Sequence, residues 1–135
     1  MGKFQHCKML FNITLSKLLN RKITMLHSYK KYVKYRIKTP LPSYRQFPCV
    51  TPNFDNASRR MHKGFTAFIG STPQLYGKWL SSVFEKFKPY SQEENFIFIN
   101  AWNEWAEGNH LEPDQKWGRK YLEETKKNID QYKKR

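Results

Sequence analysis

Apolar side chains recur every three or four residues in three parts of the chain, and this spacing predicts helices. The middle helix is expected to begin at Thr72-Pro73, where a hydroxyl cap precedes a proline, and to end before Pro89. A last helix is expected after Asp114, which we interpret as its cap. The stripes expected to face a core are Leu75, Trp79, Leu80, Val83, Phe84 and Phe87 in the middle helix, and Trp117, Tyr121, Leu122, Ile129 and Tyr132 in the last.

The remaining helical pattern covers 13–37 and lies in a strongly basic part of the chain. From Met1 to Phe54 there are eleven Lys and Arg and no Asp or Glu, so most of the net charge of +14 lies there. We therefore divide the chain into a basic, helical N-terminal segment, 1–45, and a second segment, 46–135. Basic and aromatic residues together suit a polyanion. A solvated helix whose acidic neighbours lie elsewhere explains the same pattern, and no nucleic-acid-binding motif is present, so nucleic acid is not expected as a partner.

Two short apolar runs predict strands, at 47–51 and 96–100. The second begins with four apolar residues, Phe96 to Ile99, that show no alternation, as expected for a parallel strand buried on both faces. Functional side chains of open α/β sheets and barrels gather where parallel strands end. The chemistry of this protein is therefore expected just after Ile99.

A dense cluster of carboxylates, amides and indoles follows that strand. Glu104 and Glu107 are three residues apart, so a helical turn places their Cβ atoms on one face, about 5–6 Å apart. Such a pair can divide the roles of acid and base in glycoside chemistry. Trp102 and Trp105 offer apolar faces to a sugar ring, and Asn103 offers an amide to its hydroxyls. A Glu-x-x-Glu pair alone is more often a solvated helix face, but the preceding strand and the Trp-Asn-Glu-Trp frame favour catalysis.

These residues resemble a known family. The run Ile99-Asn-Ala-Trp-Asn-Glu-Trp-Ala-Glu-Gly108, followed by Leu111-Glu-Pro-Asp114, Gly118 and Tyr121-Leu122, is similar to the closing motif of the WbsX-type family. That family is a glycoside hydrolase family 99-like group found in bacterial O-antigen and capsule gene clusters. Its hydrolase relatives are endo-α-mannosidases with a (β/α)8 barrel. The resemblance covers 47–132 and is specific within 95–122.

The resemblance implies roles for individual residues. Glu104 matches the carboxylate that assists attack by the sugar's own 2-hydroxyl, and Glu107 matches the acid/base. Ala106 stands where the mannosidases have His, so hydrolysis does not follow from the resemblance. Asp55 and Asn56 resemble a second strand end of the family that faces the same pocket. The substrate-binding residues we expect are Trp102, Asn103, Trp105, Asp55, Asn56 and Glu112.

Two of these assignments have a plainer alternative. Asp55 and Asn56 equally fit a turn with an Asx cap. Arg59 and Arg60 suit an anionic group such as the phosphate of a nucleotide sugar, although an Arg pair is more often a solvated loop edge.

The length of the chain argues against a complete enzyme. A (β/α)8 barrel takes about 250 residues, whereas this chain has 135. We therefore expect an α/β fold that is the incomplete C-terminal portion of a TIM-type barrel, from a truncated reading frame. The missing N-terminal part of the barrel is an expected partner, and the chain alone is expected to be inactive. Strand edges and apolar residues such as Trp79, Phe84 and Phe87 should be exposed, which favours association.

Other features narrow the function further. No segment approaches the roughly 20 apolar residues of a membrane span, and we expect no secretory signal, because the run after Lys8 lacks an apolar core of adequate length. Cys7 and Cys49 form no disulfide framework, which indicates a reducing, cytoplasmic compartment. The four scattered histidines predict no metal site, and no cofactor is expected.

The sequence therefore predicts a carbohydrate-active protein of lipopolysaccharide O-antigen or capsular polysaccharide biosynthesis. It is expected to act on glycosidic linkages, by transfer or hydrolysis, with a glycan or nucleotide sugar as substrate. Two alternatives remain open: a basic polyanion-binding module that works through 1–45, and an inactive gene remnant.

Overall fold

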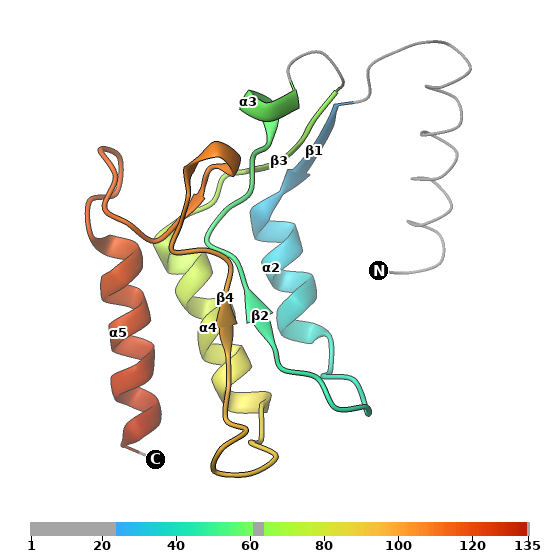
Figure 1. The fold of residues 1–135 in the computed structure, drawn as a ribbon, viewed down its shortest axis with the longest axis vertical. Coiled ribbons are helices and arrows are strands. Elements are labelled where there is room, and N and C mark those ends of the chain that lie inside the picture. The colour runs from blue at the N-terminus through green and yellow to red at the C-terminus, as the bar shows by residue number, and fades with distance from the viewer. Residues whose placement is uncertain (1–23, 61–63, 135) are drawn as a thin grey trace.

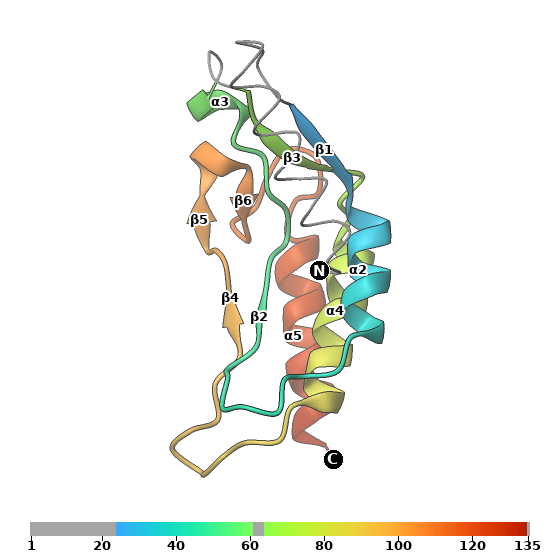
Figure 2. The same ribbon diagram turned by 90° about the vertical axis from the view of Figure 1, so that its right-hand side faces the viewer.

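Three helices lie side by side along one side of the molecule, and most of the strands lie on the other (Figures 1 and 2). The computed structural model describes residues 24–60 and 64–134. The three helices are α2 (Tyr29–Lys38), α4 (Pro73–Lys86) and α5 (Lys120–Lys133). Helix α4 packs against both of the others. A fourth, short helix, α3 (Ala57–Arg60), lies at the upper end of the molecule in Figure 1.

The strands pair two by two. Strand β1 (Met25–Ser28) runs parallel to β3 (Thr66–Ile69), and β2 (Cys49–Val50) runs parallel to β4 (Phe98–Ile99). Strands β5 (Asn103–Glu104) and β6 (Asn109–His110) form an antiparallel pair around the 3-10 turn η1 (Trp105–Glu107). The predicted α/β class is confirmed. No closed barrel forms within 24–60 and 64–134.

The boundaries of the middle helix follow local signals and are confirmed. Thr72 Oγ1 accepts a hydrogen bond from the Leu75 N–H at 3.2 Å, and Pro73 is the first helical residue. Helix α4 ends at Lys86, with Phe87 as its C-cap.

The predicted cap of the last helix is wrong. Helix α5 begins only at Lys120, and Arg119 before it provides no side-chain cap. The Asp114 carboxylate instead accepts the N–H of Trp117 in a turn that is closed by backbone hydrogen bonds to Gly118. Asp114 therefore stabilises the turn before α5 and not the helix itself.

The predicted helix over 13–37 is confirmed from Tyr29 onward and is wrong at Met25–Ser28. Residues 13–23 lie outside the described residues. Met25–Ser28 form strand β1, because their backbone pairs with β3, beginning with Met25 opposite Thr66. The helix starts at Tyr29, after Ser28 Oγ accepts the Lys31 N–H at 3.4 Å. Lys30, Lys31, Lys34 and Lys38 on this helix are exposed, as on an ordinary solvated helix face.

The core lies between the helices and the strands β2 and β4. Its buried side chains are Tyr29, Val33, Val50, Tyr76, Trp79, Leu80, Val83, Leu111 and Tyr121. The apolar stripe of α4 is thus core-facing, as predicted. The expectation that Trp79, Phe84 and Phe87 are exposed is wrong, because Trp79 and Phe87 are buried and Phe84 is half-buried against Tyr132.

Three buried tyrosines connect the helices to neighbouring segments. Tyr29 donates to the Thr51 carbonyl at 2.7 Å, Tyr76 pairs with Thr125 at 3.0 Å, and Tyr121 pairs with Ser71 at 2.9 Å. Burial raises the pKa of Tyr76 to about 12 and also raises the pKa of Tyr29 and Tyr121 above the ordinary value. All three hydroxyls are therefore neutral at physiological pH.

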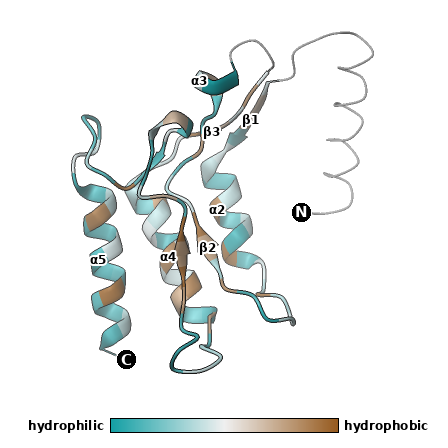
Figure 3. Ribbon diagram, in the orientation of Figure 1, coloured by the Kyte–Doolittle hydropathy of each residue, from teal (hydrophilic) through white to brown (hydrophobic). Residues whose placement is uncertain are grey.

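Strand β4 is more exposed than its sequence suggests. Phe96 and Phe98 are 50% and 54% exposed, so the expectation of a strand buried on both faces is wrong. The reason is that α2, α4 and α5 lie on one side of the β2–β4 pair and no described helix lies on its other side (Figure 2). Figure 3 shows β4 in the hydrophobic colour next to β2, whereas α3 at the upper end is hydrophilic. Of the helices described, none is long and apolar enough to cross a bilayer.

Candidate functional site

The candidate site lies where β2 and β4 end. Because the two strands are parallel, the segments that follow them leave at the same end of the pair. These segments carry α3, β5, η1 and β6, which gather at the upper end of the molecule (Figures 1 and 2). The Glu-x-x-Glu motif and the Asp55-Asn56 pair therefore lie close together, with the Asp55 N–H bonded to the Glu107 carbonyl, and a shared substrate pocket stays a prediction.

The two glutamates converge on one cation. Arg59 Nη1 lies 3.0 Å from Glu107 Oε1 and 3.9 Å from Glu104 Oε1. Because both oxygens lie this close to the same nitrogen, the distance between them cannot exceed the sum of the two nitrogen–oxygen distances. The guanidinium reduces the repulsion between the carboxylates, but all three side chains are partly exposed. The ion pairs therefore contribute at most about 1 kcal/mol to stability.

The turn η1 sets the spacing of the pair. Glu104 ends β5, and Glu107 is the last residue of η1, so the two side chains are three residues apart across a 3-10 turn. Gly108 follows with φ of 54°, in the left-handed region. A Cβ at Gly108 would lie 3.3 Å from Asp55 Cβ. Glycine at this position therefore allows the turn to approach the segment after β2.

Asp55 and Asn56 hold the backbone around the site. Asp55 Oδ1 accepts the Ala57 N–H at 2.9 Å, and the Asp55 N–H donates to the Glu107 carbonyl at 2.6 Å. Asn56 Oδ1 accepts the Thr66 N–H at 2.9 Å. The Asx-turn interpretation thus accounts for the Asp55 oxygen, whereas the Asn56 oxygen binds the first residue of β3. Substrate contact by either residue stays a prediction.

The short helix α3 is held against η1 by its own side chains. Ser58 Oγ donates to the Ala106 carbonyl at 2.6 Å, one residue before Arg59 reaches the glutamates. Sequence reasoning did not identify Ser58, and it treated Arg59 only as a possible anion ligand. The available signal was the Asx cap at Asp55, which starts α3 and directs the following residues toward the motif.

The aromatic side chains of the motif differ in how firmly they are held. Trp105 stacks on His110 with ring centroids 3.7 Å apart, and its Nε1–H donates to Glu112 Oε2 at 2.6 Å. Trp102 is 54% exposed and Asn103 is also exposed. Glu112 therefore binds an indole of the protein, which sequence reasoning had not foreseen.

A buried amide joins the two strand ends. Asn109 Oδ1 accepts hydrogen bonds from Thr51 Oγ1 at 2.9 Å and from the Ala101 N–H at 3.2 Å. The whole of Asn109 is buried. Sequence reasoning gave Asn109 no role, because an asparagine among polar residues carries no local signal of burial.

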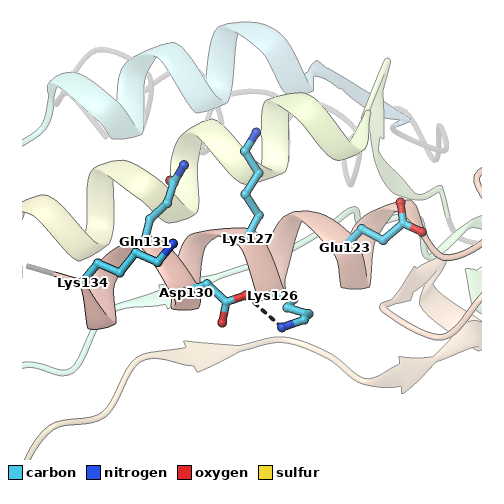
Figure 4. A pocket seen from close by; sticks show the side chains of 6 residues that line it. All are labelled: Glu123, Lys126, Lys127, Asp130, Gln131 and Lys134. Carbon is cyan, nitrogen blue, oxygen red and sulfur yellow. Dashed lines mark hydrogen bonds and ion pairs between the residues drawn. The ribbon is translucent and has the colours of Figure 1, made fainter.

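Other candidate chemistry lies elsewhere or does not form. Figure 4 shows a hollow whose lining side chains all come from α5 and its C-terminal end, with Lys126 paired to Asp130 at 2.8 Å. It is a solvated helix surface, remote in sequence from the motif. In the part of the chain that the structure describes, no three His, Cys, Asp or Glu side chains come together as metal ligands. Cys49 is a free thiol, and Cys7 lies outside the described residues.

Comparisons with known proteins extend beyond the motif. The family described as Glycosyltransferase WbsX matches residues 3–125. The chain is also similar to two curated proteins, each called Uncharacterized protein WxcX, from two strains of Xanthomonas campestris pv. campestris. Each is 40% identical over 88 residues, which are 64% of this chain and 12% of the relative. The chain thus aligns with a small part of the curated relatives' length. No solved structure matches it.

Proposed function

Since the chain belongs to the glycosyltransferase WbsX family, we propose that it supplies the carboxylate pair of an enzyme that acts on glycosidic linkages in surface-polysaccharide biosynthesis. The proposal includes O-antigen and capsular polysaccharides as the products. The observation that carries it is the convergence of Glu104 and Glu107 on Arg59, beside Trp105. A sugar site needs both features, because acid–base groups act on the linkage and an indole packs against the ring.

The carboxylates would divide the chemistry between them. When the glycosidic C–O bond breaks, a protonated carboxyl delivers its proton to the leaving oxygen. The same group, now deprotonated, later takes the proton of the incoming hydroxyl, which belongs to an acceptor sugar in transfer or to water in hydrolysis. By resemblance to the hydrolases, Glu107 is the acid/base and Glu104 assists the sugar's 2-hydroxyl. The Glu104 and Glu107 oxygens both lie near Arg59 Nη1, and this limits the distance between them. The limit is compatible with a catalytic carboxylate pair.

Arg59 bears on the nature of the donor. A guanidinium binds carboxylates and phosphates in the same way. A nucleotide-sugar phosphate that enters the site would therefore compete with Glu104 and Glu107 for Arg59. This supports a nucleotide sugar as the donor, with Arg59 beside the leaving group.

Further strand ends would complete the site. We infer that additional βα units extend the sheet beyond β4 into a TIM-type barrel, since β4 has a free edge among the described residues and exposed Phe96 and Phe98. The curated relatives, of which the aligned region is 12%, are long enough to contain them. In a barrel enzyme the groups around the substrate come from several strand ends. This chain alone is therefore expected to show little or no turnover.

The test is to restore those units and then remove each carboxyl group. The chain is co-expressed with the N-terminal part of a longer family member, and sugar transfer and hydrolysis are measured. Glu104→Gln and Glu107→Gln keep the side-chain shape but lose the proton-transfer group, so each should lower turnover by at least about 100-fold. Substrate affinity should change much less.

Glu123→Gln is the matched control, because Glu123 is exposed on α5 and lies outside the motif. It should leave turnover unchanged. Full activity in both motif variants would show that the carboxylates are structural.

A further inference from the structure

We propose that Trp105 is the fixed platform on which this site holds the apolar face of a pyranose ring, and that His110, Glu112 and Asp114 are positioning residues that hold its indole. This inference rests on the proposed function, because it assumes that the ligand is a sugar. It goes further by separating the aromatic side chain that touches the sugar from the polar side chains that do not.

The indole of Trp105 is held at one edge and on one face. At its edge, Nε1–H donates to Glu112 Oε2 at 2.6 Å, a short hydrogen bond to a charged acceptor. On its face, the His110 ring lies 3.7 Å away at an interplanar angle of 17°. Two contacts in different directions leave the indole little freedom to rotate about either side-chain torsion.

The imidazole that supports the indole is itself held. His110 Nε2 lies 3.2 Å from Asp114 Oδ2, and both side chains are largely buried. Because an ionised carboxylate only accepts hydrogen bonds, Nε2 is the protonated nitrogen. The other oxygen of Asp114 accepts the Trp117 N–H, so the carboxylate is anchored to the turn before α5. A chain of contacts thus runs from this turn through Asp114 and His110 to Trp105.

The rest of Trp105 remains available to a ligand. One face is covered by His110, yet the residue is 49% exposed. An indole that is already ordered loses little side-chain entropy when a sugar packs on it. The free energy gained from the contact therefore contributes almost fully to affinity. Trp105 also lies within the turn that ends in Glu107 and directly follows Glu104. A ring stacked there is beside the turn that carries both carboxylates.

Trp102 provides the comparison within the same motif. It is 54% exposed, close to the value for Trp105, but among the described residues no hydrogen bond or ring contact holds its side chain. The two tryptophans therefore differ in support more than in exposure. If support determines which indole binds the sugar, Trp105 is the platform and Trp102 is not.

The experiment uses the full 135-residue chain labelled with nitrogen-15, in which the four tryptophans give four indole N–H signals. Stacking on one indole needs only this motif, so binding is expected even where turnover is absent. The probes are methyl α-D-mannopyranoside, methyl α-L-rhamnopyranoside and methyl β-D-glucopyranoside. We expect at least one of them to shift the Trp105 signal and to leave the signal of the buried Trp79 in place.

The variants separate positioning from contact. His110→Ala and Glu112→Ala should each weaken binding at least about fivefold, because each removes one support of the indole. Glu112→Gln keeps an acceptor oxygen and should recover part of the affinity. Trp105→Leu should abolish binding, and Trp102→Ala should change it less than about twofold. In the unliganded protein, Trp105→Leu should also move the His110 ring-proton signals downfield, because the ring current of the stacked indole is lost.

Several results would overturn the inference: an unshifted Trp105 signal with all three sugars, unchanged affinity in Glu112→Ala, or a larger loss in Trp102→Ala than in Trp105→Leu. If His110→Ala does not fold, Glu112→Ala and Glu112→Gln decide. The proposed function fails separately. Glu104→Gln and Glu107→Gln should still bind the sugars, so full turnover of these variants in the restored enzyme would reject the acid–base roles and leave the platform in place.

Discussion

At the residue scale, Asn109 shows how one buried polar side chain connects the two halves of the site. Its Oδ1 accepts hydrogen bonds from Thr51, which follows β2, and from the Ala101 N–H, which follows β4. The carbonyl oxygen of Thr51 also accepts a hydrogen bond from the Tyr29 hydroxyl. Asn109 thus ties the ends of both parallel strands to the pair β5–β6 that carries the glutamates.

Replacing Asn109 with Ala should therefore destabilise the protein by about 1–3 kcal/mol, because the part-buried Ala101 N–H loses its acceptor, while Thr51 Oγ1 keeps the Asn53 carbonyl at 2.7 Å. The free energy of unfolding in urea measures this loss. Asn103→Ala is the control: Asn103 belongs to the same hairpin but is exposed, so its change should stay within about 0.5 kcal/mol. Equal losses in the two variants would mean that the hydrogen bonds of Asn109 do not stabilise the strand ends.

At the element scale, the turn η1 depends on the close approach of Gly108 to the segment after β2. The Asp55 N–H donates to the Glu107 carbonyl at 2.6 Å, immediately before Gly108. Gly118 offers a comparison, since it has the same φ of 54° but no atom within 4 Å of the position of a Cβ. The two glycines share one backbone conformation and differ in their surroundings.

Gly118→Ala should cost about 1–2 kcal/mol, the penalty for a Cβ in the left-handed conformation. Gly108→Ala should cost about 1 kcal/mol more, because its Cβ also presses on Asp55 in a packed region. Thermal unfolding of the two variants under identical conditions gives the difference. A smaller effect at Gly108 than at Gly118 would show that η1 can move away from Asp55 without loss.

At the scale of the whole molecule, the strand side is less covered than the helix side. The ring centroid of Phe47 lies 5.5 Å from that of Phe96 and 6.4 Å from that of Phe98. The rings of Phe96 and Phe98 remain half exposed. Together with the free edge of β4, these rings form a surface on which another strand can pair. The association expected from the sequence thus has a structural basis, at a place other than the predicted residues Trp79, Phe84 and Phe87.

The chain should therefore self-associate as its concentration rises, and Phe98→Lys should reduce this association. A charged side chain on an edge strand opposes pairing with a further strand. Sedimentation velocity over a range of concentrations measures the effect. Tyr44→Lys, which removes an exposed aromatic residue outside any strand, should leave association unchanged. A wild-type chain that stays monomeric at every concentration would contradict this prediction.

The sequence by itself determined the features that depend on nearby residues. The limits of α4 follow from Thr72, Pro73 and the apolar stripe behind them, because helix caps and helical periodicity act within one or two turns. The positions of β2 and β4 and their parallel direction were also predicted. The family resemblance carried by residues 99–122 is confirmed by the family match over 3–125. Contiguous motifs and local patterns are sufficient for conclusions of this kind.

Only the tertiary structure decided features that depend on distant partners. Met25–Ser28 has the periodicity of a helix but is a strand, because β3, some forty residues away, provides its hydrogen bonds. Phe96 and Phe98 read as buried but are half exposed, because burial requires a neighbour that the strand's own sequence does not specify. Arg59 meets Glu104 and Glu107, and Glu112 meets Trp105, through turns whose geometry no single residue reveals. The physical reason is the same in each case: local preferences are worth about 1 kcal/mol or less per residue, so packing and pairing between distant segments override them.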